Sequence, residues 1–367
     1  MGGTGVASSK AYTALFVNPA RMTEHSEDFD FGLVLPFIDV AARAEEGLVD
    51  DAEAFQDTLE EVQDLLDAGD PVGADALRPQ LADQLEALDN RRGNVSANAG
   101  IGIVLPFEGL KVGVGARAFL DAQVLTAIDP DDLTVINDPN STSADLDNLQ
   151  SEVFVAAAGV TEIALSLAKE FSVGETSLSV GVTPKLQQVE TFNYAVSIAD
   201  FDQDDAFDDL DDEQYRNDDS GFNVDLGLAM SLNDHISGGL TVRNLVSNDY
   251  QTVATNGRTF TYTVEPQATA GLAFQGAGFT ATADLDLNSV SRFSGAGGSQ
   301  FARAGLEFDA FGWLQLRAGY SIDLEDTQPE LLHAGIGISP FEVLHIDVVG
   351  LLGEDSAGAG VQLSLTF

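Results

Sequence analysis

The sequence consists largely of short segments in which apolar and polar residues alternate one by one. Over residues 361–367, Val, Leu, Leu and Phe alternate with Gln, Ser and Thr. A period of two places all the apolar side chains on one face of an extended strand. The fourteen segments with this pattern are residues 28–38, 94–106, 109–124, 153–170, 176–198, 221–233, 236–247, 260–275, 278–291, 302–308, 314–322, 332–338, 344–348 and 361–367. The pattern predicts an all-β protein.

The connections between these segments alternate between short and long. The short ones are residues 107–109, 173–175, 233–235, 275–277, 309–312 and 339–341. The long ones, which are mostly acidic, are residues 39–93, 125–152, 199–220, 248–259, 292–300, 323–330 and 353–357. A membrane barrel has short turns on one rim and long loops on the other. We therefore predict a transmembrane antiparallel β-barrel of 14 strands over residues 25–367, in the outer membrane of a Gram-negative bacterium. A soluble two-sheet protein is the alternative, but it would not explain why short and long connections alternate strictly.

The polar face of the predicted strands carries charges that must point into the barrel. A lipid-facing charge costs about 2–4 kcal/mol near the midplane of the membrane. The predicted lumen-facing cations are Lys111, Arg117, Lys185, Arg243, Arg303 and Arg317. One role for them is pairing with lumen acids, such as Asp121, Asp225, Asp284, Asp286, Glu307 and Asp347. The other role is binding a carboxylate headgroup, which the planar guanidinium of Arg contacts with two parallel hydrogen bonds.

Two prolines, Pro184 and Pro266, fall within predicted strands. Proline has no N–H to donate to a neighbouring strand. We therefore expect a bulge or a kink at each of them.

The first 24 residues lack the alternation and differ from the strands in composition. They contain the small or turn-forming residues Gly2, Gly3, Gly5, Asn18, Pro19 and Ala20. Residues 14–17 are apolar (Ala-Leu-Phe-Val) and would be poorly solvated outside the barrel. We predict that residues 1–24 form a plug or hatch inside the lumen, with a frayed terminus as the alternative.

Residues 41–90 change to helical spacing. Leu48, Phe55 and Leu59 fall on one stripe, Leu77, Leu81 and Leu85 fall on a second, and Gly69-Asp70-Pro71 separates the two. The opposite faces are strongly acidic. The spacing predicts a helical hairpin inserted in the first extracellular loop. Its apolar stripes are explained by packing of one helix on the other, and a ligand groove is the weaker interpretation.

Composition and motifs exclude several functions. The chain has 60 Asp and Glu against 16 Lys and Arg, a net charge of −44, so phosphate is repelled and nucleic acid is not expected as a partner. It has no cysteine for disulfides or thiolate chemistry. Its four histidines are scattered, and no phosphate loop appears, so we expect neither an enzyme nor a cofactor. The abrupt start at Met1 leads us to expect a processed form whose signal peptide has been removed.

One acidic run is dense enough to attract cations. Its candidate ligands are Asp200, Asp202, Asp204, Asp208 and Asp211. The run lacks the Gly and the terminal Glu of an EF-hand loop. Weak binding of Ca²⁺ or Mg²⁺ is one interpretation, and a solvated, self-repelling loop is the other.

The two ends of the chain resemble a known family. The matching features are residues 1–8, the tripeptide Asn18-Pro19-Ala20, residues 31–36 (Phe-Gly-Leu-Val-Leu-Pro) and residues 332–340. They resemble the TraF-like outer-membrane family, named after a plasmid transfer operon, which is similar to a branch of the FadL long-chain fatty acid transporter superfamily. The resemblance implies fourteen strands, an N-terminal hatch with Asn-Pro-Ala, and diffusion of hydrophobic molecules past the hatch and out through the wall. The acidic helical hairpin departs from the FadL pattern.

These features together predict an outer-membrane channel for small hydrophobic or amphipathic molecules, in which lumen cations steer an anionic head. We expect outer-membrane lipids, lipopolysaccharide and a hydrophobic small molecule as partners, and a monomer as the working form. The alternative is a structural or interaction protein that displays acidic loops to an envelope or conjugation partner and transports nothing.

Overall fold

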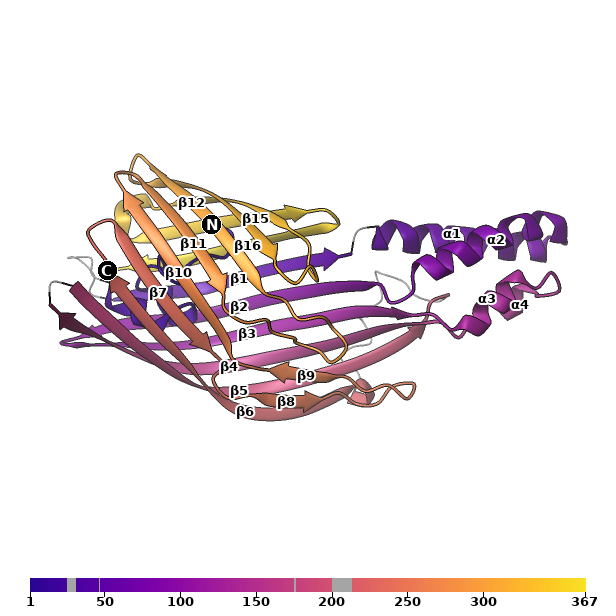
Figure 1. Ribbon diagram of the computed structural model, residues 1–367, viewed down its shortest axis with the longest axis horizontal. Coiled ribbons are helices and arrows are strands. Elements are labelled where there is room, and N and C mark those ends of the chain that lie inside the picture. Colours follow the sequence, from indigo (N-terminus) through magenta and orange to yellow (C-terminus); the bar gives the residue numbers. More distant parts are fainter. Residues whose placement is uncertain (25–30, 46, 175, 200–212) are drawn as a thin grey trace.

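The chain forms a closed barrel of fourteen antiparallel strands in the computed structural model, which describes residues 1–24, 31–45, 47–174, 176–199 and 213–367. The barrel strands are β1 (Gly32–Ala44), β2 (Arg92–Phe107), β3 (Leu110–Ala127), β4 (Glu152–Val173), β5 (Thr176–Ser197), β6 (Arg216–Ser231), β7 (Ile236–Arg243), β10 (Gln267–Gly276), β11 (Phe279–Asp286), β12 (Phe301–Ala310), β13 (Leu314–Asp323), β14 (Leu331–Ile338), β15 (Leu344–Gly353) and β16 (Ser356–Thr366). Each pairs with its neighbours in chain order, and β1 pairs with β16 to close the wall (Figure 1). The predicted strand number and closed antiparallel arrangement are confirmed.

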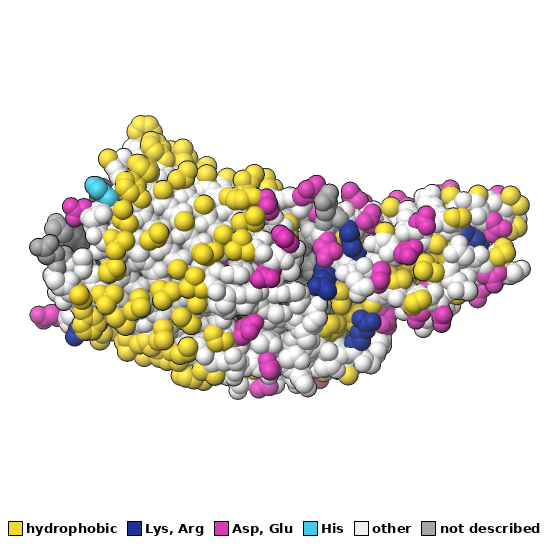
Figure 2. All heavy atoms as spheres, in the orientation of Figure 1, with side chains coloured by type: hydrophobic (Ala, Val, Ile, Leu, Met, Phe, Trp, Pro, Cys, Tyr) yellow, Lys and Arg dark blue, Asp and Glu magenta, His cyan; other side chains and the backbone are white. Residues whose placement is uncertain are grey.

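The outer surface of the barrel carries a band of exposed apolar side chains. Leu306 on β12, Leu316 on β13 and Ile336 on β14 point outward and are exposed. Figure 2 shows the apolar side chains gathered on the part of the wall near the short turns, whereas the acidic side chains lie toward the long-loop end. Soluble proteins rarely expose so large a contiguous apolar surface. The band is therefore a surface suited to contact with hydrocarbon.

The wall is much taller on one side than on the other. Strands β4 and β5 each have 22 residues, whereas β11 and β14 have 8. All of them start or end at the short turns, so the difference appears at the long-loop end of the barrel (Figure 1). The taller part of the wall thus extends beyond the apolar band.

Two prolines in the wall, Pro36 and Pro184, affect the strand pairing in different ways. The register of β1 shifts by one residue against both neighbours around Pro36, which indicates a bulge at this position. At Pro184 the register of β5 against β4 does not shift, but it omits Ser166 of β4 and its partner Thr183. The side-chain oxygens of Ser166 and Thr183 are hydrogen-bonded at 2.8 Å and bridge this gap.

The segment predicted as one strand over residues 260–275 is in fact two elements. Strand β9 (Thr261–Val264) pairs with β8 (Asn248–Gln251) in a separate two-stranded sheet, and β10 starts only after Pro266. The prediction placed Pro266 within a strand and was wrong on this point. Because proline cannot continue the ladder, the chain leaves the small sheet and enters the wall there.

The small sheet packs against the inner face of the tall wall. Tyr262 of β9 is fully buried, together with Phe154 of β4 and Phe293 from the loop after β11. The hydroxyl of Tyr262 donates a 2.9 Å hydrogen bond to Asp121 of β3. The sheet therefore narrows the long-loop mouth of the barrel.

Helices project from the long-loop end, beyond the strands (Figure 1). They are α1 (Leu48–Asp67), α2 (Pro71–Ala87), α3 (Pro130–Asn137) and α4 (Ser143–Leu146). One apolar core joins all four to the end of the wall at Val153. The predicted helical insertion started at residue 41, but residues 41–44 still belong to β1. In the part of the chain that the structure describes, none of the helices is long and apolar enough to cross a membrane.

The buried side chain of Arg78 fastens α2 to the next loop. Its Nη1 donates to the carbonyl of Ile136 at 2.8 Å, and its Nη2 donates to the carbonyl of Ser141 at 3.0 Å. Its Nε donates to Asp75 at 2.9 Å, so the charge is paired as well. The helices and the α3–α4 loop therefore form one body at the rim.

A charge placed in the apolar band should destabilise the barrel. We expect Leu306→Arg to lower the free energy of unfolding by about 2–4 kcal/mol, because the guanidinium would face hydrocarbon. Urea unfolding of the protein in lipid vesicles measures this loss. Phe311→Arg, in the exposed turn between β12 and β13, is the matched control, for which we expect less than about 1 kcal/mol. Equal losses for the two variants would contradict the assignment of the band.

Candidate functional site

Residues 1–24 fold back inside the lumen and pack against the wall. They contain two turns of 3₁₀ helix, η1 (Ala14–Phe16) and η2 (Pro19–Thr23). Asn18 caps η2 and Pro19 occupies its first position, which is where a missing N–H costs least. Ala14, Ala20 and Met22 are fully buried. The segment is therefore an ordered part of the lumen.

Asn18 connects three parts of this arrangement. Its Nδ2 donates to the carbonyl of Val6 at 2.8 Å and to the carbonyl of Leu228 on β6 at 3.0 Å. Its Oδ1 accepts a hydrogen bond from the N–H of Ala20 at 3.1 Å. One fully buried amide thus joins the start of the segment, the η2 turn and the wall.

Glycines in the wall make room for this segment. A Cβ added to Gly181 on β5 would lie 2.4 Å from the Pro19–Ala20 backbone. A Cβ on Gly227 of β6 would lie 2.2 Å from Asn18 Oδ1, and a Cβ on Gly239 of β7 would lie 2.3 Å from the carbonyl oxygen of Val6. No side chain fits at such distances. The segment therefore contacts the wall backbone on three adjacent strands.

An acid on β11, two strands beyond β7 in the wall, holds the start of the segment. Asp284 of β11 accepts hydrogen bonds from the N–H groups of Gly5 at 2.8 Å and Val6 at 3.0 Å. The sequence interpretation gave Asp284 as a partner of lumen cations. Its Oδ2 instead binds the backbone of the N-terminal segment.

Gly2 and Gly3 both have positive φ angles, of 61° and 76°. Such a backbone conformation favours glycine. Gly2 also lies against the wall, where a Cβ would be 2.8 Å from the carbonyl oxygen of Ala304. All six residues predicted for the hatch belong to this luminal segment, but Gly2 and Gly3 lie against β12 and β13, whereas Asn18, Pro19 and Ala20 lie against β5 and β6. Their action as a hatch remains a prediction.

Two cavities lie on either side of the N-terminal segment. The long-loop cavity, of about 600 Å³, reaches Lys185 on β5, Asp225 on β6 and Arg243 on β7. The short-turn cavity, also of about 600 Å³, reaches Ser179 and Ser237 on the same side of the barrel. Along each of these strands, the glycine that contacts the segment lies between the residues of the two cavities. The segment therefore divides the lumen.

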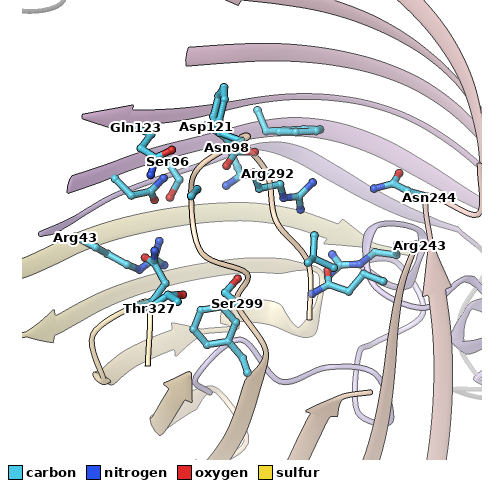
Figure 3. A pocket seen from close by; sticks show the side chains of 18 of the residues that line it. Arg43, Ser96, Asn98, Asp121, Gln123, Arg243, Asn244, Arg292, Ser299 and Thr327 are labelled. Carbon is cyan, nitrogen blue, oxygen red and sulfur yellow. The ribbon is translucent and has the colours of Figure 1, made fainter. Parts of the chain in front are cut away.

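The long-loop cavity is lined mainly by polar side chains from many strands. Figure 3 shows 18 of the lining residues, with Arg43, Asp121, Arg243 and Arg292 among those labelled around the space. Leu15 and Phe16 of the N-terminal segment contribute apolar surface to this cavity. The cavity is thus a polar, partly open compartment that borders the segment.

Four of the six predicted lumen cations line this cavity, namely Arg117, Lys185, Arg243 and Arg303. Lys111 and Arg317 do not. Sequence reasoning missed three further cations that line it: Arg43, Arg92 and Arg292. Arg43 and Arg92 lay in the region assigned to a long connection, and only a correct placement of the ends of β1 and β2 would have found them.

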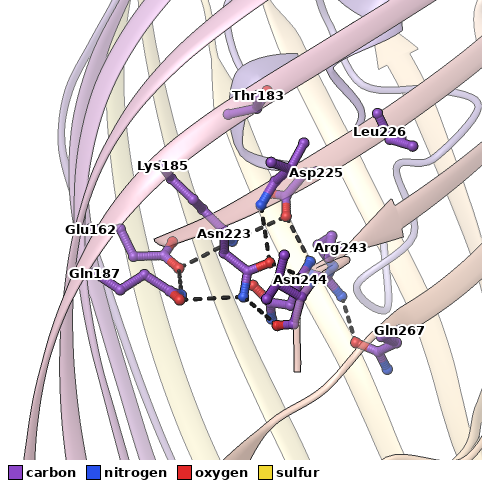
Figure 4. Close-up of polar contacts among 12 residues, drawn as sticks. Glu162, Thr183, Lys185, Gln187, Asn223, Asp225, Leu226, Arg243, Asn244 and Gln267 are labelled. Atoms are coloured by element: carbon purple, nitrogen blue, oxygen red, sulfur yellow. Dashed lines mark hydrogen bonds and ion pairs between the residues drawn. The ribbon is translucent and has the colours of Figure 1, made fainter. Parts of the chain in front are cut away.

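Lys185 lies at the centre of a buried polar network, shown in Figure 4. Its Nζ is 3.1 Å from Glu162 and 3.1 Å from Asp225. Asp225 also accepts a 2.8 Å hydrogen bond from the N–H of Asn244, the residue after β7. Gln187 donates to Glu162 at 2.6 Å. The network neutralises Lys185 and fixes the chain as it leaves β7.

Two predicted arginines are ion-paired inside the barrel. Arg303 donates to both oxygens of Asp286, at 3.0 and 3.1 Å. Arg317 is paired with Glu307 at 2.5 Å and also with Asp347. Both side chains therefore point inward, as lumen residues of a membrane barrel must.

Three of the other cavity arginines, Arg117, Arg243 and Arg292, lie beside neutral side chains. Arg243 donates to the side-chain oxygen of Gln267 at 3.0 Å, and Arg117 donates to Asn98. Arg292 lies beside the phenol of Tyr262. Burial and the neighbouring Asp121 raise the pKa of Tyr262 well above its usual value, so the phenol stays neutral.

The predicted acidic ligands Asp200, Asp202, Asp204, Asp208 and Asp211 lie outside the described residues. Among residues 1–24, 31–45, 47–174, 176–199 and 213–367, no group of three His, Cys, Asp or Glu side chains is arranged to hold a metal ion.

Comparison with known proteins gives a family match and several matching folds. The sequence profile of the family described as "F plasmid transfer operon, TraF, protein" matches residues 15–286. No curated protein sequence matches the chain.

Among solved structures, three similar barrels illustrate the shared fold. The toluene transporter TodX of Pseudomonas putida is 12% identical, with a TM-score of 0.51 over 99% of this chain and 94% of that one. The monoaromatic hydrocarbon channel CymD is 12% identical, with a TM-score of 0.54 over 100% and 95%. A FadL homologue of Pseudomonas aeruginosa is 11% identical, with a TM-score of 0.54 over 100% and 96%. At these identities the likeness concerns the fold.

Removal of the Asn18 side chain should loosen the N-terminal segment. Asn18→Ala leaves buried backbone groups of Val6, Ala20 and Leu228 without a partner, and each such group costs about 1–3 kcal/mol. Since the chain has no cysteine, a single Ser9→Cys reports the exposure of the segment. We expect Asn18→Ala to raise its rate of thiol modification at least ten-fold.

The control for this experiment is Asn137→Ala. The Asn137 side chain is exposed and bonds only within α3, to the carbonyl of Leu133. It should leave the rate of thiol modification unchanged. An unchanged rate in Asn18→Ala would show that the amide does not hold the segment.

Proposed function

The chain belongs to the family described as "F plasmid transfer operon, TraF, protein", and from this premise we propose that it is an outer-membrane channel for small hydrophobic or amphipathic molecules. In this proposal a permeant crosses the barrel from one cavity to the other, past the N-terminal segment. The segment acts as a hatch that moves to let the permeant pass.

The outer surface supports the membrane location. A closed barrel leaves no strand edge without a hydrogen-bonding partner, which is what a hydrocarbon surrounding demands of backbone groups. The exposed apolar band on the outer face of this wall places apolar side chains where a hydrocarbon surrounding requires them (Figure 2). Bacterial barrels of this type lie in the outer membrane with their short turns in the periplasm.

The divided lumen is the observation that carries the transport proposal. A protein that only displays loops needs no interior space, and its barrel would be filled by side chains and plug. Here two cavities of about 600 Å³ each remain, and the N-terminal segment lies between them. A displacement of residues around Pro19 would join them.

The solved structures with a similar fold support the class of permeant. Two of them are a toluene transporter and a monoaromatic hydrocarbon channel. By analogy of fold we propose small organic molecules as permeants. The fold alone does not determine the chemistry of the permeant, which depends on the side chains that line the cavity.

One observation favours a second function, the display of acidic surface to a partner. Helices α1 and α2 project beyond the barrel, and their outer faces carry many acids (Figures 1 and 2). An envelope or conjugation partner with a basic surface fits such a face. Loss of partner binding with intact uptake, after removal of residues 48–87, would separate this function from transport.

Fixing the segment to the wall should stop transport. Thr23 Oγ1 and Ser179 Oγ are 2.6 Å apart, so Thr23→Cys with Ser179→Cys places two thiols within bonding reach. We expect oxidation of this pair to lower uptake of radiolabelled octanesulfonate into proteoliposomes at least ten-fold, and reduction to restore it. The sulfonate stays ionised and does not cross the lipid by itself.

A matched pair controls for the chemistry. Ser166→Cys with Thr183→Cys joins β4 to β5 within the wall, where the native oxygens are 2.8 Å apart. Its oxidation should not change uptake. Uptake that is unaffected by the Thr23–Ser179 bond, or by deletion of residues 1–24, would exclude the hatch mechanism.

A further inference from the structure

Positive charge is concentrated around one cavity of a strongly acidic protein. The chain has only 16 Lys and Arg against 60 Asp and Glu. Seven of these 16 cations line the long-loop cavity, namely Arg43, Arg92, Arg117, Lys185, Arg243, Arg292 and Arg303. Since acids are so abundant, each of these cations had many possible partners within the fold.

Five of the seven cations form no ion pair with any residue that the structure describes. Lys185 and Arg303 are paired with acids of the wall. The five others are Arg43, Arg92, Arg117, Arg243 and Arg292. Outside this cavity, most arginines that the structure describes are ion-paired, including Arg21, Arg78, Arg91, Arg216 and Arg317. The cavity therefore departs from the rest of the molecule.

The acids that line the cavity form no ion pairs with these five arginines. Glu162 and Asp225 contact Lys185, and Asp121 accepts the hydroxyl of Tyr262. Glu45 and Asp326 line the cavity from segments next to the long loops. None of these five acids is within ion-pair distance of one of the five unpaired arginines.

Hydrogen-bonding capacity is also left over in the cavity. The buried Nε atoms of Arg43 and Arg117 have no acceptor among the described residues, and Asn244 Oδ1 has no donor. In folded proteins, nearly all buried polar atoms have a partner. These three atoms border one space and are available to hydrogen-bond a polar ligand.

Neutral partners hold the guanidinium groups without cancelling their charge. Gln267 orients Arg243, Asn98 orients Arg117, and Phe119 lies 5.1 Å from the Arg117 guanidinium. A guanidinium positioned in this way retains free N–H groups in a planar fork. Such a fork matches the oxygens of a carboxylate, phosphate or sulfonate.

The geometry points to binding of a compact organic anion, whose charged group carries two or more oxygens, by Arg117, Arg243 and Arg292 in the long-loop cavity. This inference rests on the proposed function and names the permeant class for the same lumen. The apolar part of the ligand contacts Leu15 and Phe16 of the N-terminal segment.

Binding of phenyl phosphate to the detergent-solubilised full chain, measured by calorimetry, tests the inference. We expect saturable binding of phenyl phosphate and none of benzyl alcohol, its neutral counterpart. Arg243→Gln should weaken binding at least ten-fold, and Arg243→Lys should restore part of it. Lys111→Gln is the matched control, because Lys111 faces the lumen but does not line the cavity, and it should leave binding unchanged.

Each outcome decides one of the two ideas. Equal binding of phenyl phosphate to Arg243→Gln and wild type, or equal binding of the neutral compound, overturns the anion site. If Arg243→Gln does not form a barrel that resists denaturation on electrophoresis, Arg117→Gln takes its place with the same expectation. Octanesulfonate uptake without phenyl phosphate binding would refute the site and leave the channel intact, whereas binding without uptake would refute the channel alone.

Discussion

Closure of the sheet between β1 and β16 is the constraint on which the other features of this protein depend. Once the first and last strands pair, every inward side chain faces an enclosed space and every outward one faces the surroundings. Alternating residues are then sorted completely, as Arg303 and Leu306 on β12 illustrate. A one-residue error in register would exchange the two faces, so the bulge at Pro36 must be shared by both neighbours of β1.

The enclosed space is occupied by backbone rather than by large side chains. Glycines on β5, β6 and β7 let residues around Asn18 approach the wall to distances at which no side chain fits. The contact is thus narrow in the direction of the barrel axis, and space remains above and below it. The polar network around Lys185 and the unpaired arginines then decide the electrostatic character of the upper space.

The strands of the barrel wall could be predicted from the sequence, whereas several of the elements that fill the lumen could not. Alternation and the parity of the connections predicted all fourteen strands, because each is a local pattern confined to about ten residues. The β8–β9 sheet was missed because its strands have four residues each and merge with the pattern of β10. Four of the cations that line the cavity were predicted because they fall on the polar face of alternating strands. Arg43 and Arg92 were lost with the strand ends, and Arg292 lies in a loop that only tertiary contacts fold inward.

The unequal height of the wall has a consequence for how molecules reach the interior. Strand β4 exceeds β14 by 14 residues, which corresponds to roughly 45 Å of extended chain along the strand at about 3.3 Å per residue. The rim at the long-loop end is therefore strongly oblique. The wall is high on the side of β4 and β5 and low on the side of β11 to β14. In the proposed channel, a solute that arrives along the membrane surface is blocked by the high wall on the side of β4 and β5. It reaches the lumen more easily across the low wall on the side of β11 to β14.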